Sequence, residues 1–299
     1  MINAERQSIA EQLDPPFEVQ CPTGDSGPVI FCSPHSGRIY PRAFLAASRL
    51  RGLMLRKSED CYVDELFAAA PRLGAPLIAA RFPRAYVDVN REPFELDPEL
   101  FAEPIPAFAN AQSVRVTGGL GTIPRIVADG EEIYAQRLPL AIGYERIERL
   151  YQPFHAALAG LIEAARARYG FAVLVDCHSM PSTILGHPHM ARPHFVLGDR
   201  FGASCDARLT RMLRSSMAAL GYDVHLNRPY AGGFITEHYG NPKQAVHAIQ
   251  IEINRALYLD EETLEKRPGF GKLTLALDRV VGKLLADASA LAAPPLAAE

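Results

Sequence analysis

The sequence lacks the features that mark several classes of protein. Its 299 residues include five cysteines, dispersed at positions 21, 32, 61, 177 and 205, and none of them forms a Cys-x-x-Cys pair. We therefore expect neither a disulfide framework nor a cysteine-based zinc cluster. No apolar run approaches the roughly 18 residues that a membrane-spanning helix needs. The sequence predicts no contact with a membrane.

An excess of charge of one sign is also absent. The chain carries 31 Lys and Arg residues against 34 Asp and Glu residues, for a net charge of −3. This balance gives no sign of a nucleic-acid or anionic-membrane partner. Residues 1–19 lack the basic and then apolar pattern of an export signal, so we expect a cytoplasmic protein. Nothing in the sequence indicates the oligomeric state.

Apolar patterning indicates a layered α/β protein. With 48% hydrophobic and 22% charged residues the chain has the composition of a folded domain. Short apolar runs predict strands, and longer amphipathic runs between them predict helices. The expected strands are 29–32, 77–80, 85–89, 171–177, 222–226 and 248–253, and the expected helices 41–55, 58–70, 142–168, 204–220 and 273–288. Their alternation favours a single α/β/α domain over residues 1–299 with a mixed, mostly parallel sheet.

Two further regions stand apart from this alternation. Residues 93–139 are rich in proline and glycine and have little periodicity, which is typical of a functional excursion rather than a linker. Residues 1–24 and 290–299 are expected to be peripheral tails.

Histidines follow two of the strongest predicted strands. His35 comes after strand 29–32, and His178 comes directly after strand 171–177. Ligands of α/β sheets bind just beyond the carboxyl ends of strands, and zinc takes imidazole and carboxylate ligands. An acid for such a site is available at Glu59, Asp60 or Asp64. Each histidine could equally be a hydrogen-bonded structural residue, and spacing alone leaves this open.

An acid and an Asn-Arg pair add to this pattern. Glu252 alternates with apolar residues in strand 248–253, so it is a candidate general base if its face meets the site and has no role if that face is solvated. Asn90 and Arg91 follow strand 85–89. The guanidinium fork suits a substrate carboxylate, although an arginine in an ordinary ion pair is also common.

Seven blocks of sequence, taken in order, resemble the N-formylglutamate amidohydrolase family over residues 25–265. The blocks are SPHSGRIYP, SEDCYVDELF, RFPRAYVDVNREPFEL, GLGTIPRIV, VDCHSMPS, NRPYAGGFITEHYG and AIQIEINRALYLDE. That family is distantly similar to zinc carboxypeptidases and aspartoacylase-type deacylases. The resemblance implies a fold like that of zinc exopeptidases and phosphorylase/hydrolase proteins. It also implies a zinc-dependent hydrolase that releases formate from N-formyl-L-glutamate, at the end of histidine breakdown.

The resemblance also implies roles for residues of this chain. His35 and His178 match two histidine ligands of zinc. The relatives' acid three residues after the first histidine is missing, because Arg38 stands there. We take Asp64 as the third ligand, with Asp60 as the alternative.

Base and substrate contacts follow from the same blocks. Glu252 matches the strand glutamate that acts as the base, and Asn90 with Arg91 matches the pair that binds the substrate carboxylate. Arg84 and Arg125 could contact a second carboxylate. Tyr230 begins a Tyr-Ala-Gly-Gly-Phe segment that resembles a mobile flap.

Other polar residues have competing interpretations. Cys177 could be a nucleophile or a small buried residue. Ser36 and Ser179 flank the two histidines and could support them by hydrogen bonds. His187, His189 and His194 could form a metal site or line a lid, and His238 and Tyr239 could contact the substrate.

Two other readings of the function remain open. The same machinery would serve a deacylase of another N-acyl amino dicarboxylate or a small peptidase, since a methylene or two changes binding by only about 1–3 kcal/mol. A non-catalytic protein that binds a carboxylated metabolite is a further alternative. Another divalent metal could replace zinc.

Overall fold

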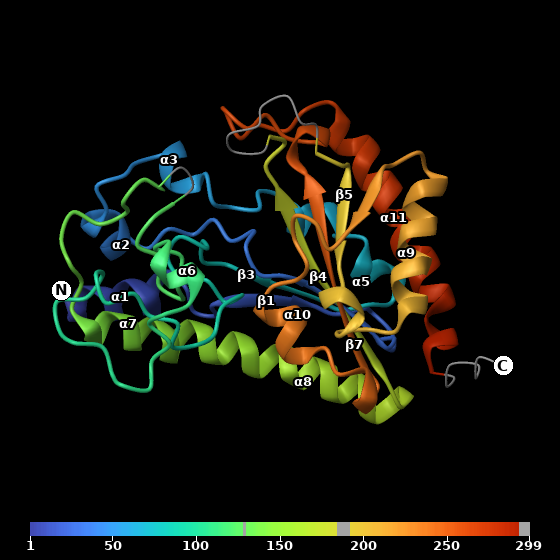
Figure 1. Cartoon of the computed structure of the whole chain (residues 1–299), viewed down its shortest axis with the longest axis horizontal. Helices are drawn as coiled ribbons and strands as arrows, with labels where there is room; N and C mark the ends of the chain where they lie inside the picture. The colour runs from blue at the N-terminus through green and yellow to red at the C-terminus, as the bar shows by residue number, and fades with distance from the viewer. Residues whose placement is uncertain (128–129, 184–191, 293–299) are drawn as a thin grey trace. The chain divides into compact units, whose positions relative to one another are not determined.

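The computed structural model describes residues 1–127, 130–183 and 192–292 (Figure 1). Helices and strands are interspersed along the chain. The helices are α1 Ile2–Gln12, α2 Arg42–Ala47, α3 Leu53–Arg56, α4 Val63–Leu66, α5 Ala70–Leu73, α6 Val114–Thr117, α7 Leu140–Arg146, α8 Gln152–Tyr169, α9 Ala207–Ala219, α10 Phe234–Tyr239 and α11 Gly269–Asp287. The strands are β1 Phe17–Gln20, β2 Val29–Ser33, β3 Leu77–Ala80, β4 Ala172–Met180, β5 Phe195–Gly198, β6 Val224–Leu226 and β7 Val246–Asn254.

The seven strands form one mixed sheet in the order β1-β3-β2-β4-β7-β5-β6. Strand β4 pairs in parallel with β2 and β7, and β5 pairs in parallel with β6. Strand β5 runs antiparallel to β7. Every residue of β4 and β7 is buried, which is the pattern of parallel strands covered on both faces. The expected α/β class with a mixed, mostly parallel sheet is confirmed.

Close contacts divide the chain into two compact units, each built from separate segments. The first comprises residues 1–18, 34–61 and 79–158, and the second comprises residues 19–33, 62–78 and 159–299. The expectation of a single domain stays a prediction.

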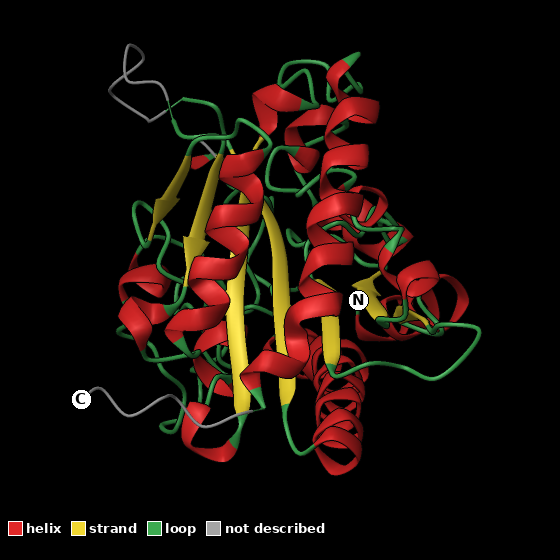
Figure 2. Cartoon of the chain, turned by 90° about the vertical axis from the view of Figure 1, so that its right-hand side faces the viewer, coloured by secondary structure: helices red, strands yellow, loops and turns green. Residues whose placement is uncertain are grey.

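The second unit contains the central strands and the helices that cover them. Helices α9 and α11 pack on each other on one side of the strands, and α10 contacts β4 and β7 on the other side (Figure 1). Figure 2, viewed from the side of α9 and α11, shows helices lying in front of the long strands. These layers leave the strand ends open to loops, where polar side chains can gather.

The first unit is organised around a buried arginine. Arg146 on α7 is fully buried, and its Nε lies 2.6 Å from Glu5 Oε1 on α1. The guanidinium also donates to Tyr134 and lies 4.0 Å from the centre of the Tyr86 ring. Tyr86 in turn donates to Glu5. Helix α1 is therefore part of this core, although residues 1–24 were expected to be a peripheral tail. Of the expected tail at 290–299, residues 293–299 lie outside the described residues.

Local structure differs from expectation around two segments that carry site residues. Residues 85–89 form turns and coil rather than a strand, although all five are buried. Their alternation reflects burial within the first unit rather than sheet pairing. The expected helix 58–70 is broken into α4 and α5, because Tyr62 has a left-handed φ of 63° just before α4. The expected helix 41–55 is likewise split into α2 and α3.

The sequence did not predict strands β1 and β5, because each has four residues and is too short to show an apolar pattern. Among the described residues, no helix combines the length and apolar character needed to cross a membrane.

Candidate active site

His35 is held between two carboxylates just beyond the end of β2. Its Nε2 lies 2.8 Å from Asp88 Oδ1, and its Nδ1 lies 3.4 Å from Asp60 Oδ2. All three side chains are almost completely buried. The backbone N–H of Asp60 also donates to the His35 carbonyl at 3.0 Å. Asp60 is therefore fixed next to the Nδ1 side of the ring, and Asp88 next to the Nε2 side.

His178 lies within β4, close to its carboxyl end. Its Nε2 is 2.9 Å from Asp176 Oδ1 on the same strand. Across the parallel pair His178 is in register with Glu252 of β7. Residues in register on neighbouring strands point to the same face of a sheet. The histidine and the glutamate therefore share one face near the strand ends.

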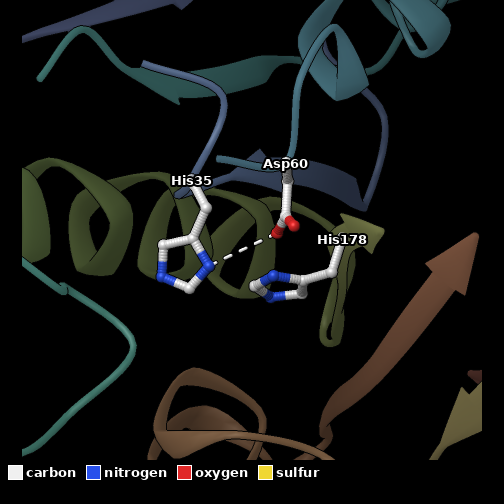
Figure 3. Close-up of side chains that lie close together, drawn as sticks. All are labelled: His35, Asp60 and His178. Atoms are coloured by element: carbon white, nitrogen blue, oxygen red, sulfur yellow. Dashed lines mark ion pairs between the residues drawn. The ribbon is translucent and has the colours of Figure 1, made fainter. Parts of the chain in front are cut away.

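The structure brings His35, Asp60 and His178 together (Figure 3). One ligand-type atom from each side chain lies within 4.8 Å of the other two, and all three residues are buried. In the part of the chain that the structure describes, this is the one group of three such side chains close enough to hold a metal ion. It contains the alternative acid, Asp60. Asp64 is in the first turn of α4 and is not a member of the group.

The carboxylate of Asp88 contacts the side chains of His35 and of two arginines. Arg84 Nε lies 2.9 Å from Asp88 Oδ2, and Arg91 Nη2 lies 3.5 Å from the same oxygen. Burial opposes the charge of this carboxylate, but Arg84, Arg91 and His35 outweigh it and hold the pKa of Asp88 well below its usual range. Asp88 is therefore ionised at neutral pH.

Asn90 and Arg91 are tightly positioned by main-chain groups. Arg91 donates from Nε to the Leu120 carbonyl at 2.9 Å and from Nη1 to the Asn90 carbonyl at 2.8 Å. The backbone N–H of Asn90 donates to Asp88. Burial lowers the pKa of Arg91 to about 10 against the opposing effect of Asp88, so the guanidinium keeps its charge at pH 7.

Arg84 and Arg125, both expected near a second carboxylate, differ in their surroundings. Arg84 contacts Asp88 and is half-buried. Arg125 is surrounded by three carboxylates, at 2.7 Å from Asp97, 2.9 Å from Glu99 and 3.5 Å from Glu132. Its charge is thus engaged by an acidic cluster of the first unit.

Glu252 is buried rather than solvated. The residue is 7% exposed, and its Oε1 accepts from Gln250 Nε2 at 2.8 Å. Gln250 Oε1 accepts from the backbone N–H of Gly233, in the segment expected to act as a flap. Neighbouring Gly232 has a φ of 118°, which side-chain-bearing residues rarely adopt. Gln250 therefore ties this segment to the carboxylate of Glu252.

Tyr230, at the start of that segment, contacts Arg192. Arg192 donates from Nη1 to the Tyr230 hydroxyl at 3.1 Å, and its guanidinium lies 5.8 Å from the centre of the tyrosine ring.

Several of the other candidate residues make contacts within the protein. Cys177 is fully buried, and burial together with Asp176 raises the pKa of its thiol well above the usual value, which does not suit a nucleophile. Ser179 accepts from Arg255, and His194 accepts from the backbone of Asp223. Ser36 is buried. His238 stacks on Phe234 and meets Tyr239 edge-on. His187 and His189 lie outside the described residues.

The sequence did not predict that Asp88 contacts His35 or that Asp176 contacts His178. Asp176 carried a usable signal, because it lies two residues before His178 on the same strand and therefore on the same face. Asp88 lay in a segment read as a strand, so its contact with His35 could not be foreseen.

Comparison with known proteins agrees with the sequence resemblance. A family model described as N-formylglutamate amidohydrolase matches residues 27–259. The chain is 32% identical to an N-formylglutamate deformylase of Pseudomonas aeruginosa over 242 residues, covering 79% of this chain and 83% of the relative. It is 34% identical to an N-formylglutamate deformylase of Pseudomonas putida over 209 residues, covering 68% and 71%.

A solved structure extends this match to the fold. The crystal structure of N-formylglutamate amidohydrolase from Ralstonia eutropha JMP134 superimposes with a TM-score of 0.86 at 35% identity, covering 91% of this chain and 97% of that one. The range matched by the family model contains His35, Asp60, His178 and Glu252. The chain belongs to the N-formylglutamate amidohydrolase family.

Proposed function

We propose that this protein is a metal-dependent amidohydrolase that converts N-formyl-L-glutamate and water into L-glutamate and formate. The observation that carries the proposal is the buried group of His35, Asp60 and His178. Family membership supports the substrate, because relatives at 32% and 34% identity are named N-formylglutamate deformylases.

The donor set fits a catalytic metal. Two imidazoles and one carboxylate are the ligand set of many catalytic zinc sites, which keep a further position open. Asp88 and Asp176 contact the Nε2 atoms of His35 and His178, as carboxylates commonly do behind metal-binding histidines. When bound there, zinc or another divalent ion would act as a Lewis acid on the formyl carbonyl and lower the pKa of water toward about 7.

Glu252 is the proposed general base. It shares a face with His178 and is held by Gln250. The carboxylate would accept a proton from the attacking water as the water oxygen bonds to the formyl carbon. As the carbon–nitrogen bond breaks, Glu252 would return that proton to the departing amine, and formate would leave.

Arg91 and Asn90 would bind a carboxylate of the substrate. Main-chain carbonyls already orient the Arg91 guanidinium, so little side-chain freedom would be lost on binding. A substrate held in this way presents its amide in one position, which accelerates the reaction by orientation.

The test is formate release from N-formyl-L-glutamate by the purified zinc-loaded protein, with the Glu252→Gln variant as a control. Release by the wild type that is strongly reduced in the variant supports the proposal. Release of the acyl group from N-acetyl- or N-succinyl-L-glutamate, with none from the formyl compound, would move the activity to another N-acyl amino dicarboxylate. Binding of N-formyl-L-glutamate without turnover would favour a non-catalytic binding protein.

A further inference from the structure

An N-formylglutamate substrate has two carboxylates, and Asn90 with Arg91 accounts for one. Neither Arg84 nor Arg125 is well placed to take the second, because Arg84 donates from Nε to Asp88 and Arg125 is surrounded by acids. Resting on the proposed function, we propose that Arg192 binds the side-chain carboxylate of the substrate and so selects an acidic side chain.

Arg192 carries a charge that no acidic side chain among the described residues neutralises. Among the residues that the structure describes, it forms no ion pair, and its buried Nε has no hydrogen-bond partner. The only described side-chain acceptor that it uses is the neutral hydroxyl of Tyr230. An arginine with donors directed at no protein carboxylate is suited to bind a carboxylate from a ligand.

The backbone at Arg192 is anchored to the end of β7, which carries the proposed base. The side-chain amide of Asn254 donates to the carbonyls of Arg192 and Pro193, at 3.3 and 3.2 Å. The backbone N–H of Asn254 donates to the carbonyl of His194 at 2.9 Å. Asn254 is two residues beyond Glu252 on the same strand and on the same face. These bonds hold the start of the Arg192 side chain beside the carboxyl end of β7.

The spacing suits a glutamate side chain. Glu252 and Asn254 are two residues apart on β7, which corresponds to about 6.6 Å along the strand. Five bonds separate the formyl carbon from the side-chain carboxyl carbon, which puts these atoms about 6 Å apart in an extended conformation. A substrate with its formyl group at Glu252 and His178 can therefore extend its side chain toward Arg192.

Arg255 is an alternative at the end of β7, and its contacts favour a structural role. It lies just after β7, is 7% exposed, and donates from Nε to Ser179 at the end of β4. This hydrogen bond links the carboxyl ends of β4 and β7. Tyr230, by contrast, leaves Arg192 its charge and orients the guanidinium through the hydroxyl.

The test compares two substrates of the same shape, N-formyl-L-glutamate and N-formyl-L-glutamine, in the zinc-loaded full-length protein. The amide has the size of the carboxylate but lacks its charge. We expect Arg192→Met to lower kcat/KM for N-formyl-L-glutamate by about 10- to 100-fold, mainly through KM, as loss of a charged hydrogen bond implies. The value for N-formyl-L-glutamine should change little. Arg214→Met, an exposed arginine on α9, is the matched control.

Further variants distinguish a role in substrate preference from a general effect on folding. Arg192→Lys should retain part of the preference for the acidic substrate, and Tyr230→Phe should weaken it to a smaller degree. Equal losses with both substrates, or no loss with either, would overturn the role of Arg192. A wild type that releases no formate from N-formyl-L-glutamate would instead defeat the proposed function, and this inference with it.

Discussion

At the scale of single residues, the choice of acid in the metal group has the sharpest consequence. Asp60 is placed against His35 by a backbone hydrogen bond as well as by its side chain, whereas Asp64 is on α4 and outside the group. We predict that Asp60→Asn loses zinc, because an amide is a poorer ligand than a carboxylate, and that Asp64→Asn retains it. Zinc content per chain after dialysis measures this. Equal retention by both variants would contradict the assignment of either acid.

Asp88 links the metal group to Arg84 and to Arg91, the arginine proposed to bind a substrate carboxylate. It contacts His35 on one oxygen and Arg84 and Arg91 on the other. Asp88→Asn should weaken metal affinity about 10- to 100-fold and raise KM, because Arg91 loses the counter-charge that helps to position it. Metal titration and steady-state kinetics measure the two effects. Asp97→Asn, which removes a partner of Arg125 instead, should change neither, and an equal effect there would point to general destabilisation.

Glu252 should affect the chemical step without affecting metal binding. Glu252→Gln keeps the shape of the side chain but removes the proton acceptor, so kcat should fall by a factor on the order of 10² to 10⁴. Zinc content should be unchanged, since Glu252 is not in the metal group. The exposed Glu237 provides a control variant, Glu237→Gln. Near-normal turnover by Glu252→Gln would rule out Glu252 as the base.

At the scale of elements, strands were predictable where they determine the site, and loops were not. The apolar runs located β2, β4 and β7 closely enough to place His35, His178 and Glu252 at one end of a sheet. The segment from Glu59 to Tyr62 is predicted as helix, but a left-handed residue, Tyr62, separates Asp60 from Asp64 there. Periodicity does not report such a backbone conformation, so the sequence left Asp60 and Asp64 as alternatives.

The segment around Asp88 was misread for a related reason. Residues 85–89 alternate as a strand does but form buried turns. Three side chains contact the carboxylate of Asp88, and they come from positions 35, 84 and 91. Such contacts depend on tertiary structure and have no local signature in the sequence.

Strand β7 also contains a histidine that should make stability depend on pH. His247 accepts from the backbone N–H of Asp206 at its Nδ1, which requires that nitrogen to be unprotonated. Burial lowers the pKa of His247 below its usual 6.5, against an opposing effect of Asp206. The unfolded chain therefore takes up a proton more readily than the folded one, so the free energy of unfolding should fall as pH drops below about 6.5.

Denaturant unfolding of the metal-free protein at a series of pH values between 5 and 8 measures this slope. His247→Gln, which retains an acceptor but does not titrate there, should reduce it. His225→Gln, on the exposed part of β6, should leave it unchanged. A slope that is identical in all three proteins would contradict the role assigned to His247.

At the scale of the whole molecule, the site gathers residues that are far apart in the sequence. His35, Asp60 and His178 span more than a hundred positions, so an unfolded chain cannot hold them in one place. Zinc should therefore bind the folded state and stabilise it, by about 2.7 kcal/mol at a free concentration of 100 times Kd. Differential scanning calorimetry should show a Tm several degrees higher with zinc than after chelation. An equal Tm in both states would mean that no metal binds the native protein.

The central claim is that a metal ion at His35, Asp60 and His178 enables release of formate from N-formyl-L-glutamate. The most direct measurement follows zinc content and formate release on the same sample during chelation and subsequent titration with zinc, for the wild type and Asp60→Asn. We predict that wild-type activity disappears with the metal and returns in proportion to zinc, reaching its maximum at one ion per chain, while the variant does not recover. Full activity in the chelated, zinc-free wild type would contradict the account.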